Sequence, residues 1–300
     1  ALKCPISSVF MASTGVIGEK LNYKKIITKI PKMSENLKEG NWNKAATAIT
    51  TTDTFPKGAS EVALIGNEKI QITGIAKGSG MIAPDMATML SFIFTDANIP
   101  SSILQTLLSR NVQNTFNAIT VDSDASTSDT LLLFATGAAK SKAPTSADDP
   151  VLKDFELALQ SVMLNLAKQI VCDGEGAQKL IQINVTGANS KKSARKIGLA
   201  IANSPLVKTA IAGGDANWGR VVMAVGKSGE KANPDKISVC FGKTTIAEKG
   251  AVVEGYDEAP VTEHLQGREI HITVDVGLGN GKSTVWTCDL THGYIDINAD

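Results

Sequence analysis

Residues 151–171 carry the clearest periodic pattern of the chain. Apolar side chains recur there at helical spacing, at Phe155, Leu159, Val162, Leu166 and Ile170. Such a stripe predicts an amphipathic helix whose apolar face packs against a core. Asp173 and Gly174 follow this stretch and predict the end of the helix.

A second pattern, with a period of two residues, predicts β-structure before this helix. Apolar residues alternate with others on both sides of Gly66-Asn67, at Val62, Leu64, Ile70 and Ile72. Alternation around turn-forming residues is typical of a β-hairpin, here over residues 61–76. The chain therefore has to combine sheets with helices.

Shorter runs predict the remaining elements. Residues 5–12 predict a short buried strand ending at Ser13-Thr14-Gly15, and residues 22–50 are predicted to be helical in part. In residues 22–50 the candidate buried positions are Ile26, Ile27, Ile30, Leu37, Ala45 and Ile49. Ser101 and Ser102 can cap a helix whose apolar face holds Ile103, Leu104, Leu107, Leu108 and Val112. Further strands are predicted in the second half of 81–96 and at 237–241, 270–276 and 284–288, with a helix around 191–203.

These elements predict an α+β protein with two units. A length of 300 residues fits about two domains. The character of the sequence changes beyond residue 188, so we expect a catalytic domain over 1–188. Residues 189–300 then form a second, smaller α+β domain, with residues 287–300 as its tail.

Composition and charge narrow the classes of function. Lys+Arg and Asp+Glu both number 30, which gives no electrostatic reason to expect nucleic acid or an anionic membrane as partner. The cysteines, Cys4, Cys172, Cys240 and Cys288, are far apart in sequence. The histidines, His264, His271 and His292, have no metal-ligand spacing. We therefore expect neither a metal site nor a disulfide framework, and a reducing compartment fits best.

Thr88 in the segment KGSGMIAPDMATML (77–90) is a candidate nucleophile. A threonine hydroxyl needs a base, and cleavage of the Ala87–Thr88 bond would supply one as a free α-amino group. The unperturbed pKa of such an amine is about 7.7–8.0, so part of it is neutral at physiological pH. From the residues alone, the favoured interpretation is a threonine that merely opens a buried strand, because Ala-Thr is a common dipeptide.

Four other segments combine turn geometry with polar side chains. Ser13-Thr14-Gly15 can form an oxyanion hole or a capped turn. The run Thr50–Thr54 suits a polar pocket or an ordinary strand. Asp173–Gly176 exposes the Glu175 carboxylate at the end of a helix, where the dipole disfavours it. Residues 213–220 (GGDANWGR) form either a contact loop or a structural one.

Seven ordered motifs extend across the whole chain: ASTGVIG (12–18), TTDTFPK (51–57), KGSGMIAPDMATML (77–90), DGEGA (173–177), ANSPLVKTA (202–210), GDANWGRV (214–221) and WTCDLTHGYIDINAD (286–300). Together they resemble the glutamate N-acetyltransferase (ornithine acetyltransferase) family, bifunctional enzymes of arginine biosynthesis. The resemblance implies layered sheets flanked by helices, as in N-terminal-nucleophile enzymes.

The resemblance also implies the chemistry. The precursor would cut itself between Ala87 and Thr88 into α and β chains, and Thr88 would carry the acetyl group. Thr14 and Gly15 match the oxyanion hole. The positions that match substrate contacts are Thr51, Lys77, Thr88, Glu175 and Asn298. Asn298 would bring the tail 287–300 back to the active site.

The implied reaction is ping-pong. N-acetylornithine acetylates Thr88, ornithine leaves, and glutamate takes the acetyl group. No cofactor is expected, although acetyl-CoA can serve as a donor in some members. The expected assembly is a dimer of αβ units, in the cytoplasm or, in a eukaryote, the mitochondrial matrix.

Two departures from the family pattern stand beside the match. Only eleven residues precede Ala12, and family members usually run past INAD, so the chain is expected to be incomplete at both ends. A third, lesser departure is Thr50, which stands where a methionine is more usual. The alternatives are a related N-terminal-threonine aminopeptidase or amidohydrolase, with water as acceptor, and an uncleaved binding protein.

Overall fold

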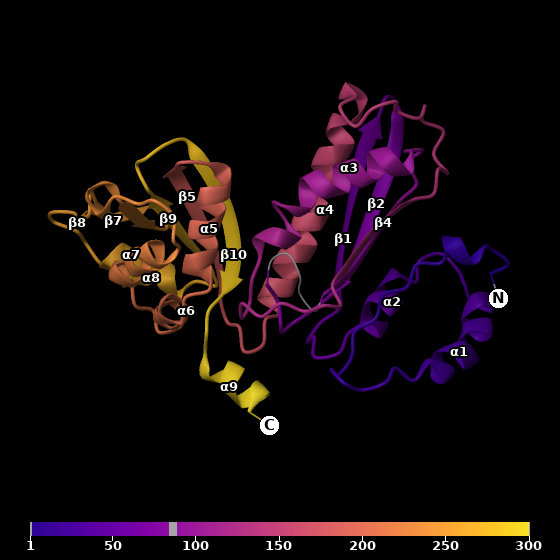
Figure 1. Cartoon of the computed structure of the whole chain (residues 1–300), viewed down its shortest axis with the longest axis horizontal. Helices are drawn as coiled ribbons and strands as arrows, with labels where there is room; N and C mark the ends of the chain where they lie inside the picture. The colour runs from indigo at the N-terminus through magenta and orange to yellow at the C-terminus, as the bar shows by residue number, and fades with distance from the viewer. Residues whose placement is uncertain (1, 84–88, 300) are drawn as a thin grey trace.

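Two β-sheets, each flanked by helices, form the two halves of the chain (Figure 1). The structure is a computed structural model that describes residues 2–83 and 89–299. The first sheet has the order β1-β2-β3-β4, and the second has the order β10-β5-β9-β6-β7-β8. The predicted α+β class with layered sheets is confirmed.

The hairpin of the first sheet is the one that the alternating pattern predicts. Strand β1 (Lys57–Ile65) pairs antiparallel with β2 (Glu68–Lys77), and Ile65 lies opposite Glu68. Gly66 in the intervening turn has φ of +63°, in the left-handed region that glycine adopts without strain. Strand β3 (Leu90–Thr95) pairs antiparallel with β2 and parallel with β4 (Thr130–Ala135).

The long helix α4 (Lys153–Cys172) covers one face of this sheet through its contacts with β1 and β2. The predicted apolar face is buried, at Phe155, Leu159, Val162, Leu166 and Ile170. Gly74 of β2 lets the helix approach closely, because a Cβ there would lie 2.9 Å from Leu166 Cδ1. Helix α3 (Ser101–Val112) packs beside α4 and β4. The predicted serine cap is wrong, because the N-cap position is Pro100.

The second sheet runs through the C-terminal half of the chain. Its strands are β5 (Leu180–Ala188), β6 (Ser238–Phe241), β7 (Thr244–Glu248), β8 (Ala251–Val252), β9 (Glu269–Asp275) and β10 (Gly281–Cys288). Helix α5 (Lys191–Ala202) packs on β5 and β10. The other helices are α6 (Pro205–Ala212), α7 (Trp218–Lys227), α8 (Ala259–Gln266) and α9 (His292–Asn298). Short 3₁₀ turns span Phe116–Ala118 (η2), Pro150–Leu152 (η3) and Pro234–Lys236 (η4).

The division into domains at residue 188 stays a prediction. Because β5 is the second strand of the C-terminal sheet, we propose a boundary between α4 and β5 instead.

The N-terminal segment differs most from expectation. The predicted buried strand at 5–12 is wrong, since Ile6–Ser8 is an exposed 3₁₀ turn, η1. Helices α1 (Tyr23–Glu35) and α2 (Trp42–Ala48) form within 22–50 as predicted. However, Ile26, Ile27, Ile30 and Leu37 are 40–71% exposed, and Ala45 is exposed while Ala46 is buried. Periodicity identifies an apolar face but not the element that covers it.

The described residues include no helix both long enough and apolar enough to cross a membrane.

Leu166 gives a test of the packing between α4 and the first sheet. We expect Leu166→Ala to lower the free energy of unfolding by about 2–5 kcal/mol, because it leaves a cavity in a closed core. Leu157→Ala on the same helix is the matched control: Leu157 is 57% exposed and should cost far less. Urea unfolding of both variants measures the difference. Equal losses would contradict this assignment of the buried face.

Candidate active site

Residues 77–83, the connection that leaves β2, lie at the centre of the candidate site. Gly78 has φ of +151° and Met81 has φ of +55°, a conformation uncommon for a residue with a side chain. Carboxylates hold the backbone in place. Gly78 N–H donates to Asp53 (2.7 Å), while the amides of Met81 and Ile82 donate to Asp122 (2.7 and 3.0 Å). A strained segment fixed by its surroundings is a frequent mark of a functional site.

Lys77 and Thr51 form the first pair of predicted site residues. The Lys77 ammonium donates to the Thr51 hydroxyl at 2.9 Å, and Lys77 is only 3% exposed. Burial lowers the pKa of Lys77, the Asp53 carboxylate acts to raise it, and the Lys57 ammonium acts to lower it; the net pKa lies below its usual value. An ammonium in this position can bind a carboxylate.

Glu175 and Asn298 form the second pair. Asn298 Nδ2 donates to Glu175 Oε2 at 2.8 Å, so α9 at the end of the chain reaches the loop after α4. Figure 1 shows α9 projecting from the C-terminal sheet on a single connection. The Glu175 amide donates to Ser79 O (3.2 Å), and a Cβ on Gly80 would lie 2.6 Å from the Glu175 carboxylate. The segment 77–83 therefore contacts both pairs.

Lys57, Asp53 and Asp173 form a buried ion network next to these pairs. The Lys57 ammonium contacts Asp53 Oδ1 at 2.6 Å and Asp173 Oδ2 at 2.5 Å, and the three side chains are 0–2% exposed. Burial acts to raise the pKa of Asp53, but hydrogen bonds from the Gly78 amide, the Lys57 ammonium and the Thr51 amide outweigh it, so this pKa is lowered. Asp173 also accepts hydrogen bonds from the backbone and hydroxyl of Thr54.

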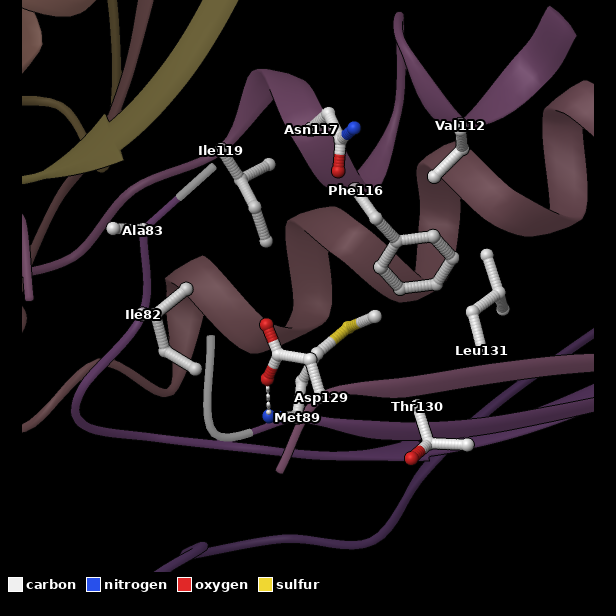
Figure 2. A pocket seen from close by; sticks show the side chains of 10 residues that line it. All are labelled: Ile82, Ala83, Met89, Val112, Phe116, Asn117, Ile119, Asp129, Thr130 and Leu131. Atoms are coloured by element: carbon white, nitrogen blue, oxygen red, sulfur yellow. Dashed lines mark hydrogen bonds between the residues drawn. The ribbon is translucent and has the colours of Figure 1, made fainter. Parts of the chain in front are cut away.

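Asp129 directly precedes β4 and lies beside Met89. Figure 2 shows its carboxylate directed at the Met89 amide, which donates to it at 2.8 Å. The surrounding cavity has a volume of about 140 Å³. Most of its lining is apolar, including Ile82, Phe116 and Ile119. Burial raises the pKa of Asp129 to about 6, although the Met89 hydrogen bond acts to lower it.

The predicted site residues thus fall into three groups. Thr51, Lys77, Glu175 and Asn298 form the two hydrogen-bonded pairs. Ala87 and Thr88 lie outside the described residues. Thr14 is half-buried and Gly15 is exposed in the N-terminal segment, and a Cβ built on Gly15 would meet nothing within 4 Å. Their place in the oxyanion hole stays a prediction.

The histidines and the loop at 213–220 make local contacts in the structure. His264 Nε2 accepts the His271 amide at 2.9 Å, and His292 is exposed at the first turn of α9. Asn217 caps α7, so residues 213–220 have at least a structural role. Among the described residues no cluster of three or more His, Cys, Asp or Glu side chains could hold a metal ion.

Sequence reasoning missed Asp53, Lys57, Asp122, Asp129 and Asp173 as site residues. Three of them stand inside the motifs quoted above, Asp53 and Lys57 in TTDTFPK and Asp173 in DGEGA. The available signal was a charged residue beside each predicted contact. Nothing in the sequence shows that these charges meet.

Asp129→Asn gives a test of the pKa assigned to this carboxyl. Because the folded pKa of about 6 exceeds the unfolded value near 3.8, ionisation destabilises the fold as pH rises between these values. The amide oxygen of asparagine can still accept the Met89 amide. We therefore expect Asp129→Asn to be stabilising above pH 6, by up to about 1 kcal/mol after allowance for solvent screening. At low pH, where Asp129 is protonated in both the folded and unfolded states, we expect no such gain. Thermal unfolding across pH 3–8 measures this, and a stability difference independent of pH would contradict the assignment.

Comparisons with known proteins agree with the motifs. A family model described as the ArgJ family matches residues 1–300. The arginine biosynthesis bifunctional protein ArgJ of Gluconobacter oxydans (strain 621H) is 59% identical over 297 residues, which cover 99% of this chain and 70% of that protein. The protein of the same name from Brucella suis biovar 1 (strain 1330) is 55% identical over 303 residues, covering 100% of this chain and 73% of that protein.

A solved structure shares the fold. The crystal structure of arginine biosynthesis bifunctional protein argJ from Bacillus halodurans matches with a TM-score of 0.67 and 42% identity. The match covers 69% of this chain and 97% of that one. The sequence-based assignment to the bifunctional acetyltransferases of arginine biosynthesis is confirmed, and the chain belongs to the ArgJ family.

Proposed function

We propose that the protein transfers the acetyl group of N-acetylornithine to glutamate through an acetyl-Thr88 intermediate. Its relatives are named as bifunctional proteins of arginine biosynthesis. The observation that best supports the proposed site is the pairing of Lys77 with Thr51 and of Glu175 with Asn298, both against the segment that leads towards Thr88.

The charges of these pairs suit amino-acid substrates. N-acetylornithine and glutamate both carry an α-carboxylate, and the Lys77 ammonium is buried where it can bind one. Glu175 offers the opposite charge for the substrate's ammonium group. Thr51 and Asn298 supply neutral hydrogen-bonding groups that orient the two charged side chains. Charge-assisted hydrogen bonds of this kind both bind and orient a substrate.

The proposed reaction proceeds in two half-reactions. Thr88 Oγ attacks the acetyl carbonyl carbon while the Thr88 α-amine takes the hydroxyl proton. The tetrahedral intermediate collapses, the C–N bond breaks, and ornithine leaves with that proton. The amine of glutamate then attacks the acetyl ester, and Thr88 regains its hydroxyl proton as N-acetylglutamate departs. Thr14 and Gly15 are proposed to donate hydrogen bonds to the oxyanion in both steps.

The proposal also covers the class of reaction, the acetyl donor, the assembly and the location of the protein. The names of the relatives favour a biosynthetic transferase over the aminopeptidase or amidohydrolase alternative. Acetyl-CoA remains a proposed second donor, with no bound cofactor. We propose a dimer of αβ units in the bacterial cytoplasm, because the relatives are bacterial proteins.

Thr88→Ala tests processing and transfer together. We expect it to abolish both cleavage of the Ala87–Thr88 bond and acetyl transfer, because each requires the hydroxyl. Thr88→Ser, which retains a hydroxyl, is the matched control and should keep part of both activities. Intact mass under denaturing conditions detects a β chain that begins Thr88-Met89-Leu90. Normal cleavage of Thr88→Ala would contradict the autocatalytic account. Repeated release of ornithine from N-acetylornithine by the wild type without added glutamate would favour a hydrolase.

The pH profile identifies the base. If the Thr88 amine takes the proton, the rate should rise through an apparent pKa at or below about 7.7–8.0. His292 is the competitor, because it is exposed in the same tail as Asn298. His292→Asn should leave this rise in place. If His292→Asn instead loses both the increase of rate with pH and most of the rate, His292 is the base.

A further inference from the structure

Lys57 is a buried cation without an assigned role in the reaction. Its ammonium lies 2.6 Å from Asp53 and 2.5 Å from Asp173, with side-chain exposures of 0%, 0% and 2%. Removing such charges from water is costly, and apolar residues of similar volume are often at least as stabilising. A contribution to stability therefore does not explain this network, and the segments that it connects indicate its role.

Each carboxylate of the network belongs to a segment that carries a proposed substrate contact. Asp53 stands two residues after Thr51, and it also accepts the Gly78 amide, directly after Lys77. Asp173 stands two residues before Glu175. Its backbone carbonyl accepts the Ser79 hydroxyl at 2.6 Å.

The segments are therefore linked through one ammonium group. Three stretches far apart in sequence, 51–57, 77–80 and 173–175, meet at Lys57 and its two partners. The substrate contacts at Thr51, Lys77 and Glu175 extend from these stretches.

We propose that Lys57 is a positioning residue, which fixes the separation between the Lys77 ammonium and the Glu175 carboxylate by bridging Asp53 and Asp173. The inference rests on the proposed function of these two side chains. A fixed separation between a cation and an anion selects a zwitterionic substrate of matching length. Lys57 thereby contributes to substrate specificity without touching the substrate.

The same network acts on Lys77 electrostatically. The charged groups that act on Lys77 are Asp53 and Lys57, with the neutral Thr51 hydroxyl as its hydrogen-bond acceptor. Asp53 raises the pKa of Lys77, whereas Lys57 lowers it. Since Lys77 must be protonated to bind a carboxylate, KM should rise at alkaline pH, and the network should set where this rise occurs.

The decisive variant removes the bridge at constant local charge. Wild type has two carboxylates and one ammonium in the network, a formal charge of −1, and Lys57→Met/Asp173→Asn leaves Asp53 alone, also −1. Arg110→Met/Asp148→Asn is the matched control, since it removes an exposed ion pair (2.6 Å) between α3 and the loop before η3. Asp53→Asn is a second, milder variant.

The matured full-length αβ protein is compared by thermal unfolding, cleavage at Thr88, and kcat and KM for N-acetylornithine from pH 7 to 10. We expect the double variant to lose about 10²-fold in kcat/KM, mainly through KM, as small misplacements do. The alkaline rise in KM should move to higher pH in Lys57→Met/Asp173→Asn and to lower pH in Asp53→Asn. The control should match wild type.

Unchanged constants in a folded double variant would overturn the inference. The inference would also be overturned if the pH at which KM rises were unchanged, or shifted in the same direction, in Lys57→Met/Asp173→Asn and Asp53→Asn. A merely structural role of the network predicts no opposite shifts. If the double variant does not fold, KM of Asp53→Asn at pH 7 decides: loss of this arm of the bridge should raise it, and an unchanged KM would overturn the inference. An inactive, uncleaved wild type would instead contradict the proposed function itself.

Discussion

The arrangement of the candidate site depends on one buried contact, the Lys57 ammonium between Asp53 and Asp173. Lys57 opens β1, Asp53 lies in the approach to that strand, and Asp173 caps α4. Packing of α4 on β1 and β2 brings these ends together in a region without solvent. In such surroundings each charge needs a partner, so the end of the helix and the start of the sheet are locked to each other.

The contacts of Lys57 with Asp53 and Asp173 support residues 78–82, which adopt an unfavourable backbone conformation. Residues 78–82 leave β2 with positive φ at Gly78 and Met81, and Asp53 and Asp122 hold their amides. The apolar core of the first sheet supplies the stability that offsets this strain. Rigid support on both sides of the segment is what a preorganised site requires, because reacting groups must stay within a fraction of an ångström of their productive positions.

The C-terminal sheet contributes to the same site through its last strand. Beyond β10, Asp289 accepts the amides of Gln178 and Lys179, and Thr291 donates to Gly176 O. A Cβ on Gly176 would collide with the backbone of Gly293 and Tyr294, so the tail lies directly on the glycine of the DGEGA motif. These contacts hold the start of α9 beside Gly176, and Asn298 near the end of the helix reaches Glu175.

The sequence by itself determined the family, the hairpin and the helix, which was predicted at 151–171 and lies at 153–172. It also identified Thr51, Lys77, Glu175 and Asn298, which form the two hydrogen-bonded pairs of the candidate site. Period and motif are local properties, and Gly66-Asn67 or the stripe on α4 can be read without knowing their partners. The tertiary structure decided which strands pair, which helix faces are covered and which charged side chains meet. The exposure of α1, and the position of β5 in the second sheet, depend on packing between distant segments. The same is true of Lys57, whose partners lie 4 and 116 residues away, because a buried charge is defined by the groups that surround it and not by its neighbours in sequence.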